Sequence, residues 1–317
     1  MLMKHLIPNW ISPAWRALGF SLALFAAAQV NAAGTGKTFA TPEAAVAAVA
    51  EAVTTTNRTE LHAIFGPAAD ELVNPDAVQA ATEFATFASA LTTTNRLAGE
   101  SLTRRVLELG NDHWPFPVPI VQKEGRWFFD TAAGVEELTN RRIGGNEVQT
   151  LLAVRAYVQA QRDYASRDRD GDGVLEYAQK MISTPGTKDG LFWSPDFDGE
   201  ISPLGPLAAD AAAEGYGRGQ KTDGDEPRPF HGYLSKILTR QGKHAPGGKH
   251  GYITNGKMIG GFALVAWPAH YGETGIMTFI VNQQGRVYQK DLGPNTARTA
   301  AAMKAYDPDR TWSVSAD

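Results

Sequence analysis

The sequence has 317 residues, of which 30 are basic and 34 acidic, and it contains no cysteine. The lack of cysteine excludes disulfide bonds, thiolate chemistry and lipid attachment at a signal-peptide cysteine. A formal charge of −4 with no basic run gives no electrostatic footprint for nucleic acid or an anionic lipid surface. A chain of this length is typical of two domains.

Residues 1–32 have the features of a cleavable secretory signal peptide. Lys4 and Arg16 give a positive start, residues 17–28 form a short apolar run, and Val30 and Ala32 flank the expected cleavage position. The apolar run is shorter than the roughly 20 residues of a membrane-spanning helix, which leaves a retained membrane anchor as the alternative. We therefore expect a periplasmic or secreted protein with no membrane span after cleavage. Cleavage removes two basic and no acidic residues, so the formal charge of the mature chain becomes −6.

An N-terminal α+β domain is predicted for residues 33–145. Thr41, Pro42 and Glu43 are typical of the start of a helix, because Thr caps the backbone and Pro suits the first turn. The helices predicted here span 41–53, 58–65, 75–91 and 133–142. Alternating apolar residues predict a small antiparallel sheet from segments 101–109, 118–121 and 127–129.

The rest of the chain is predicted to form three segments. Residues 146–182 are expected to hold a helix over 146–166 and a calcium loop. Residues 183–229 are rich in Gly, Pro and Asp, which indicates a long irregular connection with a short helix at 207–214 and hence a domain boundary. Residues 230–317 are predicted to form an antiparallel β-meander with strands at 230–239, 260–267, 275–281 and 286–289 and a closing helix at 296–306.

One motif in the sequence predicts a metal-binding site. Residues 168–179 match the EF-hand type of calcium loop over its first nine positions, with Gly173 at the sharp turn. Leu175 is expected to pack into the core, and residues 177–182 are expected to begin an exiting helix. The predicted ligands of a structural calcium ion are Asp168, Asp170, Asp172, the Val174 carbonyl, Glu176 and Gln179.

The loop departs from the pattern at its twelfth position, where Gln179 replaces the usual bidentate Glu. A neutral amide supplies one oxygen and no charge, so we expect a modest affinity of the kind that extracellular calcium modules have. The alternative is a solvated Asp/Gly turn that binds nothing.

Four histidines lie in the C-terminal third, where Asp291 could complete a metal site or an acid–base pair. Their spacing matches no metal-ligand rule, so exposed or structural histidines are the favoured interpretation. These residues are His231, His244, His250 and His270.

The sequence resembles an exported bacterial family, catalogued as domain of unknown function 2950. The resemblance covers nearly the whole mature chain, and its densest part runs from His231 through the segments at 255–268 and 275–282 to 287–294. Residues 112–117, 141–147, 168–179 and 202–206 fit the family too. The resemblance implies export from a Gram-negative cell, and it carries over no catalytic residues. The meander at 260–293 is also similar to the C-terminal sheet of pilin-like proteins, although the prepilin processing site with its long apolar helix is missing.

These features favour a calcium-stabilised binding or interaction protein of the cell envelope, whose partner is an unidentified envelope protein or ligand. A hydrolase that uses His and Asp residues of the C-terminal domain is one alternative. A structural subunit of a pilus-like or secretion apparatus is another.

Overall fold

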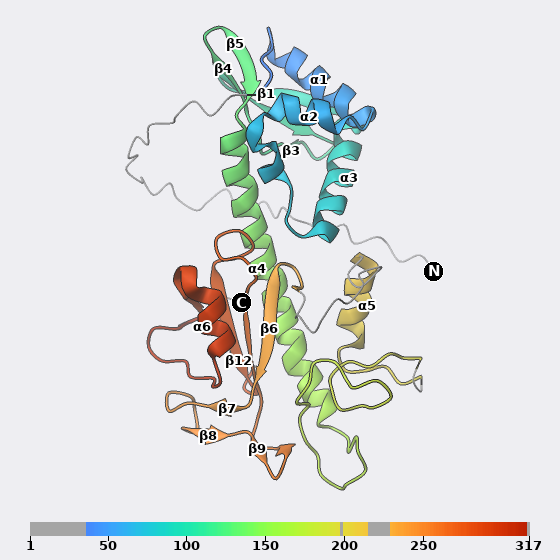
Figure 1. Ribbon diagram of the computed structural model, residues 1–317, viewed down its shortest axis with the longest axis vertical. Coiled ribbons are helices and arrows are strands. Elements are labelled where there is room, and N and C mark those ends of the chain that lie inside the picture. The colour runs from blue at the N-terminus through green and yellow to red at the C-terminus, as the bar shows by residue number, and fades with distance from the viewer. Residues whose placement is uncertain (1–35, 197–198, 215–228, 316–317) are drawn as a thin grey trace. The chain divides into compact units, whose positions relative to one another are not determined.

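The computed structural model describes residues 36–196, 199–214 and 229–315 (Figure 1). The predicted signal peptide at 1–32 lies outside these residues. The described chain consists of helices and antiparallel sheets, which confirms the α+β fold class. Among the described helices, none combines the length and the apolar character that a membrane crossing requires.

The first hydrophobic core lies between three helices and a five-stranded antiparallel sheet. Side-chain caps define the helix starts, since Thr41 accepts from the Ala44 amide and Asn57 from the Glu60 amide. The hairpin turn at Glu124 and Gly125 has two positive φ angles, as a two-residue turn requires. The helices are α1 (Pro42–Thr54), α2 (Arg58–Phe65) and α3 (Ala77–Thr93), with a 3₁₀ helix η2 (Pro67–Leu72). The strands are β1 (Asn95–Ser101), β2 (Arg104–Leu109), β3 (Trp114–Pro115), β4 (Ile120–Lys123) and β5 (Arg126–Phe129), in the order β1-β2-β4-β5 with β3 on β2.

Strand β1 was not predicted from the sequence. Its residues have little β propensity and most of its side chains are exposed, so no alternating pattern appears. It forms because its backbone pairs with β2 along the whole strand, with an irregularity between Gly99 and Ser101.

Helix α4 (Thr131–Tyr164) replaces the two helices predicted at 133–142 and 146–166. Two consecutive glycines, Gly144 and Gly145, each cost about 1 kcal/mol in a helix interior relative to Ala, which is why the sequence suggested a break. Tertiary contacts hold the helix through this point. The Asn146 amide donates to the Thr274 carbonyl at 2.9 Å, and the Glu147 carboxylate accepts from the Ile276 and Met277 amides at 3.0 and 2.9 Å.

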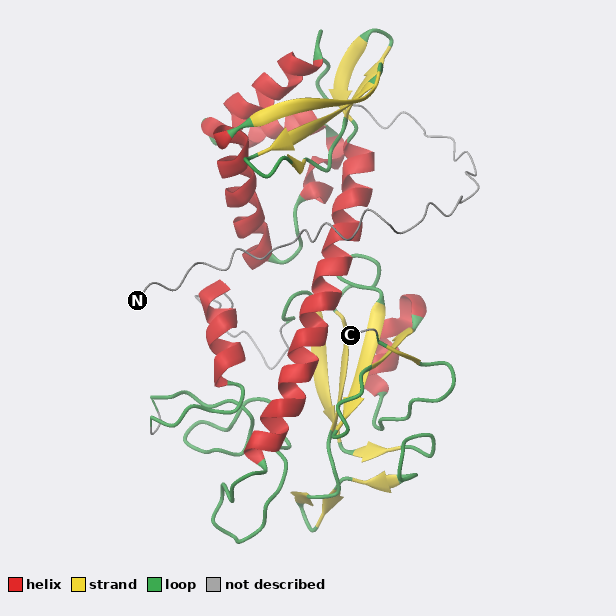
Figure 2. Cartoon of the chain, turned by 180° about the vertical axis from the view of Figure 1, so that it is seen from behind, coloured by secondary structure: helices red, strands yellow, loops and turns green. Residues whose placement is uncertain are grey.

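The second hydrophobic core surrounds a meander in which every pair of neighbouring strands is antiparallel, β14-β13-β12-β11-β6. Strand β11 is buried at all six positions, as expected for a strand covered on both faces. Figure 2 shows α4 beside this sheet, and contacts join α4 to β11 and β12 and α6 to β11. The sheet strands are β6 (Tyr233–Leu238), β11 (Ala263–Pro268), β12 (Met277–Asn282), β13 (Tyr288–Asp291) and β14 (Ser313–Val314); the helices are α5 (Gly205–Glu214), α6 (Thr296–Ala302) and the 3₁₀ helix η3 (Gly293–Asn295).

Two short strand pairs lie along the chain between β6 and β11. They are β7 (Arg240–Gln241) with β8 (His250–Gly251), and β9 (Ile253–Thr254) with β10 (Lys257–Met258).

The boundary predicted at 145/146 falls between the two cores, because the buried residues of the first end at Phe129 and those of the second begin at Val154, whereas the boundary predicted within 183–229 does not separate cores. The first boundary lies inside α4. In the described part of 183–229, Leu191, Trp193 and Leu204 are buried in the same core as Tyr157 of α4 and the meander. The irregular connection is therefore part of the second core, because it carries enough large apolar side chains to pack there.

A matched pair of glycine substitutions in α4 tests this packing. A Cβ at Gly134 would lie 2.5 Å from Val118 Cγ2 and 3.1 Å from Val118 Cα, whereas a Cβ at Gly144 meets no atom within 4 Å. We expect Gly134→Ala to destabilise the fold by about 1–3 kcal/mol through overpacking. Gly144→Ala should stabilise it by about 0.4–1 kcal/mol. Urea unfolding midpoints of both variants, with unchanged m values, measure this; equal shifts would contradict the assigned packing.

Candidate functional site

The acidic loop that follows α4 brings three carboxylates together. One oxygen from each of Asp168, Asp170 and Asp172 lies within 4.8 Å of the other two. Asp168 fixes the turn, because its two oxygens accept from the Gly171 and Gly173 amides at 2.8 and 2.7 Å. Both glycines have positive φ, which the tight turn requires. All three aspartates are exposed.

A lysine from a distant part of the chain lies among these carboxylates. Lys257, at the start of β10, places its ammonium 2.7 Å from Asp170, 3.2 Å from Glu176 and in contact with Asp172. The turn Asn255-Gly256 that presents it has positive φ at both residues, as in a tight hairpin. Lys257 therefore supplies a positive charge where the loop concentrates negative charge.

The structure brings only some of the predicted calcium ligands together. Glu176 faces β10, since its second oxygen accepts from the Met258 amide at 3.3 Å. Gln179 donates to the Gly256 carbonyl at 2.7 Å. Glu176 does not belong to the group of three convergent carboxylates.

Two features expected of an EF-hand are absent from the described loop. Residues 177–182 form no helix; instead Tyr177 bridges to Met258 and Ile182 to Phe192. Leu175 is 57% exposed, so the prediction that it packs into the core was wrong. The chain leaves the loop in an extended conformation because its backbone hydrogen bonds go to β10 and to Phe192, not to a following helical turn.

Buried side chains on both sides of the loop hold its ends. Gln161 of α4 is fully buried and clamps the Ala178 backbone, accepting from its amide and donating to its carbonyl, each at 2.9 Å. Arg169 points inward from between the aspartates, with its guanidinium carbon 5.6 Å from the Tyr164 ring centre and 5.4 Å from that of Trp193. It also pairs with Glu200 at 2.6 Å. The acidic loop is thus fixed at its base and exposed at its tip.

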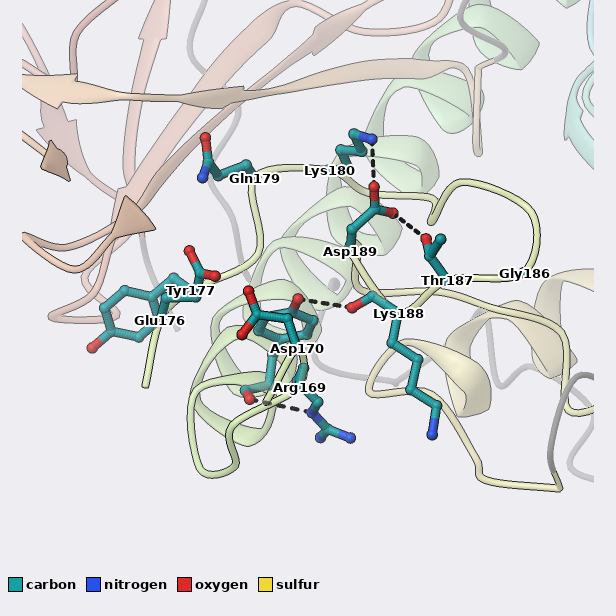
Figure 3. Close-up of a pocket in the computed structure, with 11 residues that line it drawn as sticks. Arg169, Asp170, Glu176, Tyr177, Gln179, Lys180, Gly186, Thr187, Lys188 and Asp189 are labelled. Atoms are coloured by element: carbon teal, nitrogen blue, oxygen red, sulfur yellow. Dashed lines mark hydrogen bonds and ion pairs between the residues drawn. The ribbon is translucent and has the colours of Figure 1, made fainter. Parts of the chain in front are cut away.

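The loop forms one wall of an open pocket of about 660 Å³ (Figure 3). Its other wall carries Lys180, Thr187 and Asp189, and the figure shows Asp189 joined to both Lys180 and Thr187. Arg169, Tyr164 and Tyr177 line it as well. The pocket therefore combines charged groups of both signs with aromatic rings.

The histidines of the C-terminal third do not assemble around Asp291. Asp291 accepts instead from the Tyr271 hydroxyl and the Gly293 amide. His244 pairs with Asp307 at 3.1 Å and His231 with Glu214 at 3.1 Å, while both ring nitrogens of His250 face backbone carbonyls. The His270 amide donates to Thr274. Their separate partners agree with the structural interpretation of these residues.

Sequence reasoning missed Lys257 and Arg169. Lys257 lies 87 residues from Asp170, and only the Asn-Gly turn before it hints that a hairpin presents it. Arg169 alternates with aspartates and would be taken for a solvated charge, yet its side chain is only 7% exposed.

Electrostatics couple Lys257 to the loop. Its hydrogen bonds lower the pKa of Asp170 and of Asp172 below the usual Asp range, and the same bonds raise the pKa of Lys257. Lowered carboxyl pKa values contribute stability that is present above the unfolded pKa and lost as pH falls. A raised lysine pKa contributes stability that is present below its unfolded pKa and lost as pH rises.

We therefore expect the ion pair to stabilise the fold fully between about pH 4 and pH 10, the unfolded pKa values of Asp and Lys. With chelator present, Lys257→Met should lower the urea midpoint at pH 7, and the difference from the unsubstituted protein should shrink below about pH 4. Lys123→Met, at an exposed lysine of β4, is the matched control and should show no such dependence. A Lys257→Met effect that does not shrink as pH falls below about 4 would contradict the electrostatic origin.

Comparison with known proteins gives one match. No curated protein and no solved structure matches the chain. A family described as "Protein of unknown function (DUF2950)" matches residues 36–314, which includes both cores, the acidic loop and Lys257. The chain belongs to this family.

Proposed function

We propose that the chain is an exported binding or interaction protein of the cell envelope whose acidic loop is stabilised by calcium. The observation that carries the proposal is the convergence of Asp168, Asp170 and Asp172 on one position, beside which the Lys257 ammonium lies. The features of residues 1–32 support export, and the open pocket beside the loop offers a surface for a ligand.

The spacing of the carboxylates suits calcium. Calcium binds oxygens at 2.3–2.6 Å, so two ligand atoms on opposite sides of the ion are about 4.6–5.2 Å apart. One oxygen of each aspartate lies within 4.8 Å of the others, in agreement with this geometry. Glu176 contacts the same lysine at 3.2 Å and would lose this ion pair if calcium displaced Lys257.

Lys257 and calcium would compete for the same oxygens. The ammonium brings one charge, while the calcium ion brings two and accepts more ligands. Calcium would therefore displace the lysine where its concentration is high. Displacing the lysine weakens the apparent affinity, which fits the range of about 10⁻⁴–10⁻³ M of extracellular modules. The lysine would then maintain the loop at low calcium.

A second candidate, an extracytoplasmic hydrolase, is favoured by one observation, the His244–Asp307 pair at 3.1 Å. A carboxylate that orients a histidine is the basis of many acid–base sites. If this pair is catalytic, the purified protein should hydrolyse members of an ester and amide panel and His244→Ala should abolish that activity. No turnover of the panel by the unsubstituted protein would remove the candidate.

Calcium should raise the melting temperature of the protein by a few degrees at millimolar concentration, and chelator should reverse the rise, because the ion binds only the folded loop. Asp170→Ala should remove the response, and Asp112→Ala, at an exposed aspartate in the turn between β2 and β3, should retain it. Lys257→Met should bind calcium about tenfold more tightly by isothermal titration, since the competing charge is gone.

Two results would reject calcium binding. One is an unchanged melting temperature of the unsubstituted protein over the calcium range. The other is an equal calcium response of Asp170→Ala. If Lys257→Met binds no more tightly than the unsubstituted protein, calcium binding would stand and the competition would be wrong.

Export makes a separate prediction. Intact-mass measurement of the protein recovered from the periplasm or medium of an expressing Gram-negative host should give a chain that begins at Ala33, because cleavage is expected after Ala32. Substitution Ala32→Arg should block processing and leave the full-length chain with the cells. Cytoplasmic recovery of an unprocessed, unsubstituted protein would contradict export.

A further inference from the structure

Charge is unevenly distributed along the chain. Residues 227–272 contain no Asp or Glu, although acidic residues outnumber basic ones overall. Within this stretch, Lys236 donates to the backbone at the end of α6 and Lys257 pairs with the acidic loop. Arg240 is the first residue of β7, and Lys249 lies in the bend immediately before β8.

Both of these cations line one pocket. Arg240 lies directly opposite Gly251 in the β7–β8 pair, and Lys249 lies in the bend immediately before β8, two residues from Gly251. Gly251 has no side chain, and a Cβ there would meet no atom within 4 Å. These residues line a pocket of about 480 Å³ together with Thr239, Gln241 and His250.

The two cations have no acidic partner among the described residues. Neither Arg240 nor Lys249 forms an ion pair there. Asp307 approaches the same segment, but His244 engages it through both its backbone amide, at 2.8 Å, and its ring. The pocket therefore has positive charge on its wall that the described part of the protein does not neutralise.

His250 adds a third polar group with a fixed orientation. Its Nδ1 faces the Gly248 carbonyl and its Nε2 the Gly260 carbonyl, each at 3.2 Å. A doubly protonated ring donates to both oxygens, whereas a neutral ring can donate to only one. Beneath it, Tyr252 is fully buried and donates to Gln241, whose amide holds the Pro246 and Gly248 carbonyls at 2.7 and 2.8 Å. The base of the pocket is thus rigid.

We infer that this pocket binds the phosphate group of a ligand. A planar guanidinium and an ammonium that line one pocket, beside a glycine with open space over it, match an anion that offers several oxygens and up to two charges. A carboxylate presents two oxygens and one charge and would use less of the site. The site is separate from the acidic loop and does not depend on the function proposed above.

Titration with inorganic phosphate at constant ionic strength tests the inference on the full mature chain. We expect saturable binding in calorimetry and amide shifts at His250 and Gly251 in NMR spectra. Arg240→Gln and Lys249→Gln should each weaken binding by about tenfold. Lys123→Gln, an exposed lysine of β4, should bind as the unsubstituted protein does, and acetate should bind more weakly than phosphate.

Binding to lipid vesicles distinguishes the two sources of the phosphate group, which are a lipid headgroup and a free phosphate compound. If phosphatidylglycerol vesicles, but not phosphatidylcholine vesicles, retain the protein and both variants abolish retention, the phosphate belongs to a lipid headgroup. If inorganic phosphate binds and vesicles do not, a free phosphate compound is the ligand. No saturable phosphate binding, or an equal loss in Lys123→Gln, would overturn the inference, whatever the vesicles do.

Discussion

Helix α4 is the element on which the rest of the structure depends. Its first turns pack in the first core, where Gly134 lies against Val118, and its second half supplies Tyr157 and Val154 to the second core. Between them, Asn146 and Glu147 bind the backbone of residues 274–277. The hydrogen-bonded carboxylate and amide outweigh the poor helix propensity of two neighbouring glycines. The end of the same helix then positions the acidic loop through Gln161 and Tyr164.

The acidic loop shows how a fold can hold like charges together. Carboxylates within 4.8 Å of one another repel, and that repulsion must be offset by a cation. In this structure the cation is the Lys257 ammonium, which the tight β9–β10 hairpin places against the loop. A lysine can do this without a metal. If the loop binds calcium as we propose, the stability of the loop without the ion and its affinity for the ion are opposing consequences of this one residue.

The net charge of the chain does not reveal the cationic pocket beside β7 and β8. The chain is mildly acidic, and this was the reason to expect no binding to nucleic acid or to an anionic lipid surface. Folding concentrates the basic residues of a stretch that has no acidic residue, so a local positive field forms beside β7 and β8. Fields near a surface depend on charges within about 10 Å under ordinary salt, not on the sum over the chain. A total of −4 and a cationic pocket are compatible for this reason.

Local patterns determined the elements: the capped helices α1 and α2, the two-residue turn at Glu124–Gly125, and the apolar runs that became β11 and β12. They also determined that three aspartates and two glycines would form a turn at 168–173, because that geometry is set within six residues. Tertiary structure alone decided the continuity of α4, the pairing of β1, the burial of Leu191, Trp193 and Leu204, and the partners of the acidic loop. These rest on contacts between residues far apart in the sequence, and no local propensity encodes them. Lys257 and Arg169 illustrate the limit, since each is an ordinary charged residue until the fold places carboxylates or aromatic rings around it.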